Sequence, residues 1–96
     1  MENRVDDIVK QLEDAAQKLH VQKRKEAYGV INSAAGTLFL FLEEAAGSEI
    51  GKIMLPKINM ALQQCLEAME QKDDVLAADV IEYEIIPLLL QLEAAK

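Results

Sequence analysis

Apolar residues recur at every third or fourth position along nearly the whole chain, and this spacing restricts the fold more than any other feature. It matches the 3.6-residue turn of an α-helix, so each segment has one apolar side to bury. In the first segment that side consists of Val5, Ile8, Val9, Leu12, Ala16 and Leu19. Helices of this kind bury their apolar sides against one another. We therefore predict an all-α fold, an antiparallel four-helix up-down bundle.

The expected helices span residues 3–20, 24–46, 49–71 and 74–94. Ser48 can cap the third helix and Asp73 or Asp74 the fourth, while Gly47 can close the second in the left-handed conformation. The boundary between the first and second helices rests only on Lys23, which occupies a position where the apolar stripe of the first helix would need an apolar residue. Since no Gly or Pro marks that boundary, one long helix over residues 3–46 is an open alternative, and it would require a dimer.

Two prolines fall inside predicted helices, where each removes a backbone hydrogen bond. A kink or short break is expected near Leu55–Pro56, because Ile50 and Ile53 are out of phase with the rest of the third helix. In the fourth helix, Pro87 should free the carbonyl of Tyr83 and bend the helix nearby.

Size and charge exclude several classes of protein. A chain of 96 residues is the size of one domain. Its 17 acidic against 10 basic residues, a net charge of −7, disfavour binding to nucleic acid or anionic membranes. The longest apolar run, 85–90, is far shorter than the roughly 20 residues of a membrane span. A single cysteine and a start without a signal pattern favour a cytoplasmic location.

No combination of residues indicates catalysis, a cofactor or a metal centre. The only histidine, His20, leaves no room for the paired Glu-x-x-His motifs of di-iron bundles. Cys65 lies on an apolar stripe without a neighbouring His, so we expect a buried, inert thiol. In the last helix, Asp79 lies beside an apolar stripe and one turn before Tyr83, which belongs to that stripe, while Glu82 shares a polar strip with Asp79. We expect them to make structural hydrogen bonds, and the alternative is a polar anchor for a peptide or metal.

Charged residues near the first turn form the only positive cluster in this acidic chain. Its members are Lys18, Lys23, Arg24 and Lys25. Clusters of this kind are usually solvated, and we expect the same here.

Two segments carry more apolar residues than one small bundle needs. The run 38–42 places apolar side chains on nearly all sides of the second helix. The fourth helix has two apolar stripes, whereas a helix of a simple bundle needs only one. The candidate interface residues are Phe39, Leu40, Ile81, Ile85, Leu88 and Leu92. We predict a non-enzymatic protein-interaction module that forms a homodimer or binds an amphipathic helix of a partner. The alternatives are a small-ligand or metal-binding bundle and a secretion or flagellar chaperone.

The last third of the chain contains a series of short motifs. Lys72-Asp73 is followed by Ala78-Asp79, by Glu-Tyr-Glu at 82–84 and by Pro-Leu-Leu at 87–89. This segment resembles small uncharacterised helical-bundle proteins of Gram-positive bacteria, with Ala77 standing where their pattern has Leu. The resemblance implies a helical bundle without an assigned activity.

Overall fold

The computed structural model describes residues 4–94, and every regular element in that range is helical. The elements are α1 (Arg4–His20), α2 (Arg24–Ala45), α3 (Glu49–Glu70), α4 (Asp74–Val80), η1 (Ile81–Ile85) and α5 (Ile86–Ala94). The last three follow one another without a break and together form a fourth helix. These bounds confirm the all-α prediction, and they agree with the predicted helices to within one residue. The predicted start at residue 3 lies outside the described residues.

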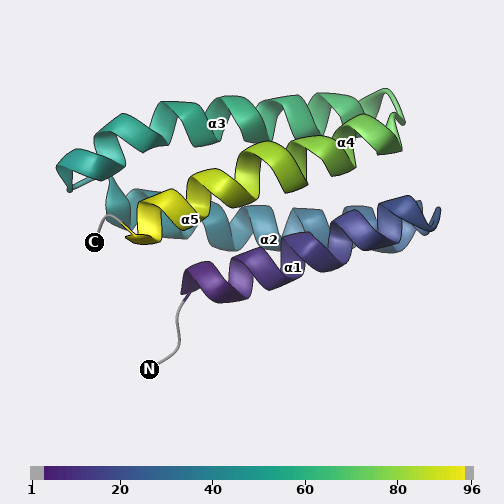
Figure 1. The fold of residues 1–96 in the computed structure, drawn as a ribbon, viewed down its shortest axis with the longest axis horizontal. Coiled ribbons are helices and arrows are strands. Elements are labelled where there is room, and N and C mark those ends of the chain that lie inside the picture. The colour runs from purple at the N-terminus through teal and green to yellow at the C-terminus, as the bar shows by residue number, and fades with distance from the viewer. Residues whose placement is uncertain (1–3, 95–96) are drawn as a thin grey trace.

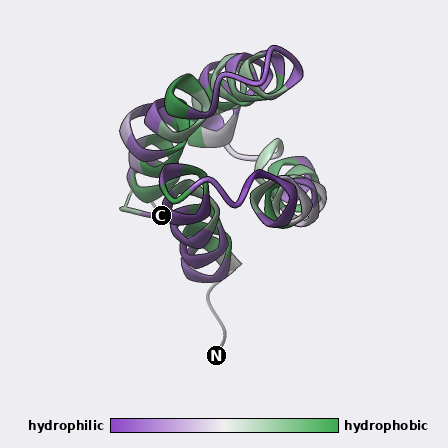
Figure 2. Ribbon diagram, turned by 90° about the vertical axis from the view of Figure 1, so that its right-hand side faces the viewer, coloured by the Kyte–Doolittle hydropathy of each residue, from purple (hydrophilic) through white to green (hydrophobic). Residues whose placement is uncertain are grey.

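The helices lie side by side and surround a common interior (Figures 1 and 2). The fourth helix contacts both α1 and α3, whereas α2 packs mainly against α1 and only lightly against α3. The fourth helix is therefore covered on two sides, while α2 lies at the edge of the bundle. Within the described residues, no helix is long and apolar enough to cross a membrane.

Aliphatic side chains build the core, since the chain has no Trp and only two Phe and two Tyr. The largest side chains in full burial are Ile8, Ile31, Leu38, Ile58, Ile81, Ile85, Leu89 and Leu92. Burying each of them contributes about 1.5–3 kcal/mol relative to leaving it exposed. No polar or charged residue is buried among those that the structure describes.

The α1–α2 and α3–α4 turns are built alike. Gln22 and Lys72 adopt left-handed backbone conformations, with φ of 65° and 57°. In each turn, the N–H of the next residue donates to the carbonyl five residues earlier, at 2.8 Å. This hydrogen bond ends a helix in the Schellman manner, here without glycine. The structure thus has two separate helices over residues 4–45, and the alternative of one long helix is wrong.

The α2–α3 turn differs from the expectation for Gly47. No glycine in residues 4–94 has a positive φ, so Gly47 is not a left-handed cap. The reversal instead uses Ser48 in an extended conformation, and its hydroxyl accepts a hydrogen bond from the Gly51 N–H at 3.0 Å, as expected of a cap. A Cβ on Gly51 would lie 1.9 Å from the carbonyl oxygen of Ala45. The close approach of α2 to the first turn of α3 therefore requires glycine at position 51.

The two prolines have different consequences. α3 continues through Pro56 without the break considered at Leu55–Pro56, and because its phase is kept, Ile53 is left exposed. Before Pro87, residues 81–85 form a π-helix in which the Ile86 N–H donates to the Ile81 carbonyl. A π-turn adds one residue to a helical turn. The irregularity expected near Pro87 thus takes the form of a π-turn just upstream of it.

Two glycine variants should separate a steric requirement from a tolerated glycine. Gly51→Ala should destabilise the protein by about 1–3 kcal/mol, because its methyl group has no space against Ala45. Gly47→Ala should be neutral or stabilising by up to about 1 kcal/mol, because nothing lies within 4 Å of its Cβ and its φ is not positive. Urea unfolding followed by circular dichroism measures both. Equal losses would contradict the steric argument.

Candidate functional site

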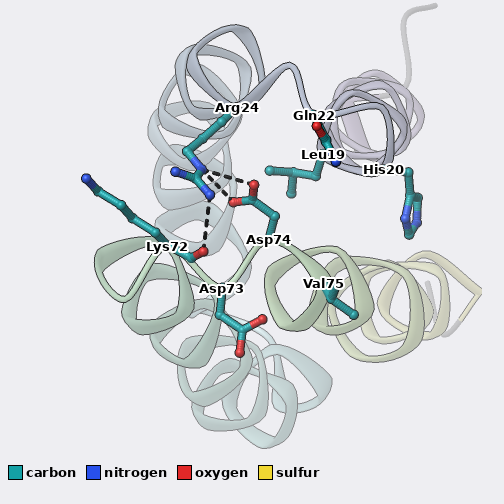
Figure 3. Close-up of a pocket in the computed structure, with 8 residues that line it drawn as sticks. All are labelled: Leu19, His20, Gln22, Arg24, Lys72, Asp73, Asp74 and Val75. Carbon is teal, nitrogen blue, oxygen red and sulfur yellow. Dashed lines mark hydrogen bonds and ion pairs between the residues drawn. The ribbon is translucent and has the colours of Figure 1, made fainter.

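A polar cluster lies where the α1–α2 and α3–α4 turns meet (Figure 3). Arg24 begins α2 and Asp74 begins α4. The Arg24 Nε is 3.0 Å from each carboxylate oxygen of Asp74, and its Nη2 donates to the Lys72 carbonyl at 3.3 Å. This pair ties the first turn of α2 to the start of the fourth helix. Arg24, expected in a solvated basic turn, is instead half-buried in an ion pair.

Tyr28 extends this cluster one turn along α2. Its hydroxyl lies 3.1 Å from the Met69 carbonyl and 3.2 Å from Asp74 Oδ1. Burial and then the Asp74 charge raise the pKa of Tyr28, and the hydrogen bond to Asp74 raises the pKa of Arg24. Tyr28 is thus held neutral and Arg24 charged. Asp74 accepts from both Arg24 and Tyr28, so the cluster ties α2 to the start of the fourth helix.

His20 lies at the same end of the bundle but belongs to a different pair. Its Nε2 is 2.8 Å from Oε1 of Glu82, and both side chains reach solvent. In Figure 3, His20 points away from Arg24 and Asp74. The pair joins the last residue of α1 to η1.

The three predicted polar anchors do not converge on one site. Glu82 pairs with His20, Asp79 is exposed, and the Tyr83 side chain is 73% exposed. Among residues 4–94, no group of three or more His, Cys, Asp or Glu side chains is arranged to hold a metal ion.

Tyr83 and Leu88 share one hollow between α3 and the fourth helix. The hollow has a volume of about 410 Å³ and also includes Met60, Ala61 and Pro87, with Lys57, Gln64, Glu84 and Gln91 among its lining residues. One predicted polar anchor and one predicted interface residue therefore lie together at this hollow.

The interface predicted on the fourth helix is wrong for three of its four residues. Ile81, Ile85 and Leu92 are fully buried in the core of the single chain, and Leu88 is half-buried. Contact with both α1 and α3 requires apolar residues on two sides, so the stripe interpreted as surplus is core. The exposed apolar residues of the fourth helix are Val75, Leu76, Tyr83 and Leu90.

The prediction for the second helix places apolar residues on the surface, and the structure agrees. Phe39 is 51% exposed and Leu40 is 62% exposed. They belong to an exposed side of the helix, called here the α2 outer face, whose positions follow in steps of three and four, with Leu40 next to Phe39. The α2 outer face consists of Lys25, Gly29, Asn32, Gly36, Phe39, Leu40 and Glu43. A Cβ on Gly29 or Gly36 would meet nothing within 4 Å, so the middle of this face is open.

Cys65 lies in the core, where burial raises the pKa of its thiol to about 11. Only the thiolate is an effective nucleophile. At neutral pH the thiol is therefore protonated as well as inaccessible, in agreement with the expected inert cysteine.

Comparison with known proteins yields a family but no activity. A family model described as a domain of unknown function (DUF8042) matches residues 1–95. No curated protein and no solved structure matches the chain.

Removal of the Asp74 carboxylate tests the structural tie. Asp74→Ala should lower the free energy of unfolding by about 1–2 kcal/mol, because Tyr28 and Arg24 lose the charged acceptor that they share. Asp79→Ala is the matched control, since Asp79 is an exposed carboxylate on the same helix, and its effect should stay within about 0.5 kcal/mol. Chemical denaturation gives both values. Similar losses in the two variants would show that the cluster adds no stability.

Cys65 predicts a specific loss of stability at high pH. The unfolded thiol ionises near pH 8.5–9, whereas the folded thiol keeps its proton up to about pH 11. Stability is therefore fully present below pH 8.5 and falls as pH rises towards 11, by about 3 kcal/mol for two pKa units. Cys65→Ala should have a shallower decline over this range in urea titrations. Identical slopes, or rapid reaction of the native thiol with a disulfide reagent at pH 8, would contradict the burial argument.

Proposed function

We propose that this chain, which belongs to the DUF8042 family of domains of unknown function, is a non-enzymatic protein-interaction module. Its binding surface is the α2 outer face. The observation that carries this proposal is the adjacent pair Phe39 and Leu40, each more than half exposed on a face that no other helix of the bundle covers. Removing side chains of this size from water contributes about 1.5–3 kcal/mol each when they are fully buried.

The shape of the α2 outer face favours another α-helix as the bound element. Apart from Leu40, its positions alternate in steps of three and four residues, the spacing along which two helices meet in a coiled coil. The open space over Gly29 and Gly36 lets a second backbone approach closely, while Phe39 and Leu40 supply apolar area beside it. These properties complement the apolar side of an amphipathic helix.

The polar groups support a role without catalysis. Arg24, Tyr28 and Asp74 are bound to one another, and His20 pairs with Glu82. Cys65 is buried and protonated at neutral pH. These groups stabilise the fold. Arg24 and Tyr28, next to Lys25 and Gly29 in the chain, hold one end of the α2 outer face in place.

The setting of the module is also a proposal. We place it in the cytoplasm of a Gram-positive bacterium, with the single buried Cys65 and the motifs at 72–89 as support.

A photo-crosslinking residue at Asn32, in the middle of the α2 outer face, tests this surface in the host cell. Irradiation should give one defined covalent adduct, and Leu40→Glu should reduce its yield about tenfold, because a charge replaces buried apolar area. The same residue at Val75, which is 68% exposed on α4, is the control and should give no adduct.

Folding of the variant must be measured alongside the crosslinks. Leu40→Glu should retain the helicity and melting temperature of the parent chain, whereas Leu62→Glu, in the core, should unfold it. If Leu40→Glu unfolds like Leu62→Glu, or if Asn32 and Val75 give equal adducts, the α2 outer face is not a binding surface.

A further inference from the structure

We propose that the helix bound on the α2 outer face is α2 of a second copy of the same chain, in antiparallel orientation. The two-fold axis relating the copies lies level with Ala34. This inference rests on the proposed function, since it names the partner of the same surface. It would make the protein a symmetric homodimer, in which one patch contacts an identical patch.

Charge complementarity is the first argument for this partner. Lys25 precedes Ala34 by nine residues and Glu43 follows it by nine, and both side chains are exposed on the α2 outer face. In an antiparallel pair centred at Ala34, Lys25 of each copy therefore faces Glu43 of the other. A parallel pair would bring like charges together at both ends. The charges thus select the antiparallel arrangement and set its register.

Side-chain size provides a second and independent argument for the same axis. Phe39 follows Ala34 by five residues and Gly29 precedes it by five. The axis that pairs Lys25 with Glu43 therefore also places the exposed Phe39 ring of one copy over the open space at Gly29 of the other. Gly36 meets Asn32 in the same way. The largest ring of the α2 outer face thus lies over a residue without a side chain, which lets the two helices pack closely.

The bundle leaves this surface available because α2 lies at its edge. Its buried residues point towards the interior and α1, whereas the residues of the outer face are exposed. At the start of α2, Lys25 and Gly29 border a hollow that also includes Asp14 and Lys18 of α1. The charged end at Lys25 is next to Arg24, which is held by Asp74. The start of α2 is therefore held in place before association, which lowers the entropy lost on binding.

Reversing the two charges one at a time gives a sharp test on the purified full-length chain. Lys25→Glu and Glu43→Lys should each weaken dimerisation about tenfold, because two attractive contacts per dimer become two repulsive ones. Repulsion between the net charges of whole chains predicts a different result for the two variants. Lys25→Glu makes the net charge more negative and Glu43→Lys makes it less negative, so repulsion between whole chains would weaken only the first. Sedimentation equilibrium measures the dissociation constants.

Mixing the two variants provides the decisive result. In a mixed dimer, Glu at position 25 faces Lys at position 43 at one end, and Lys25 faces Glu43 at the other, so attraction returns at both ends. An equimolar mixture should therefore dimerise with nearly the affinity of the parent chain. Thermal melts of each variant, expected to match the parent apart from the dimer contribution, confirm that both are folded.

The size argument is tested by filling the open space. Gly29→Leu should fold, since its Cβ meets nothing in the single chain, but it should reduce dimer affinity about tenfold by displacing Phe39 of the second copy. Gly47→Leu, outside the α2 outer face and equally open, is the control and should leave affinity unchanged.

The outcomes distinguish this inference from the proposed function. Loss with each reversal and recovery on mixing support the antiparallel dimer, as does an Asn32 adduct of twice the chain mass. A monomeric parent chain, or no recovery on mixing, overturns it. If the parent chain is monomeric and Asn32 still gives an adduct of another mass, the module binds a different helix and the proposed function stands. If there is neither a dimer nor an adduct, both proposals fail.

Discussion

Burial of the fourth helix between α1 and α3 is the constraint on which the rest of the structure depends. Ile81, Ile85 and Leu89 are fully buried because helices cover them from two directions. Once that position is occupied, α1 has one side left for α2, and α2 remains at the edge with a light contact to α3. The exposed apolar side chains of α2 thus result from the position of this helix at the edge of the bundle. This arrangement leaves Phe39 and Leu40 on the outside of a peripheral helix, where they are available for binding.

Much of the fold follows from local sequence. Periodicity defines the helices to within one residue, and Ser48 and Asp73 cap the helices as expected, because capping depends on a few neighbouring residues. The exposure of Phe39 and Leu40 was also predictable, since their angular distance from the buried stripe of α2 is known from the sequence. Which stripe of the fourth helix is buried was not, because two apolar stripes look alike until the neighbouring helices are placed. Gly51 was missed for a similar reason, as its requirement comes from a carbonyl in the preceding turn.

The polar tie shows a second limit of prediction from sequence. Arg24 and Asp74 are 50 residues apart, and each begins a helix directly after a turn whose charged residues would suit solvent equally well. Only the similar geometry of the two turns brings both helix starts to the same end of the bundle. The sequence did hold a signal, since Arg24 and Asp74 each begin a helix two residues after the left-handed residue of their turn. That likeness becomes informative only once the helices are packed. The tie also holds α2, the helix with the lightest contacts to the rest of the core.

The π-turn at 81–85 determines which residues of α5 lie on the buried side of the fourth helix. In a continuous α-helix, the stripe through Ile81 and Ile85 would pass next to Leu88, yet Leu89 is fully buried and Leu88 only half-buried. The extra residue in the π-turn has moved the buried position of the following turn from residue 88 to residue 89. With one residue fewer in this segment, the π-turn would close to an ordinary α-turn, and Leu89 would take the place seven residues after Ile81 that a continuous α-helix buries. The π-turn thus holds one residue more than a regular α-helix would and still keeps the buried stripe aligned from Ile81 to Leu89.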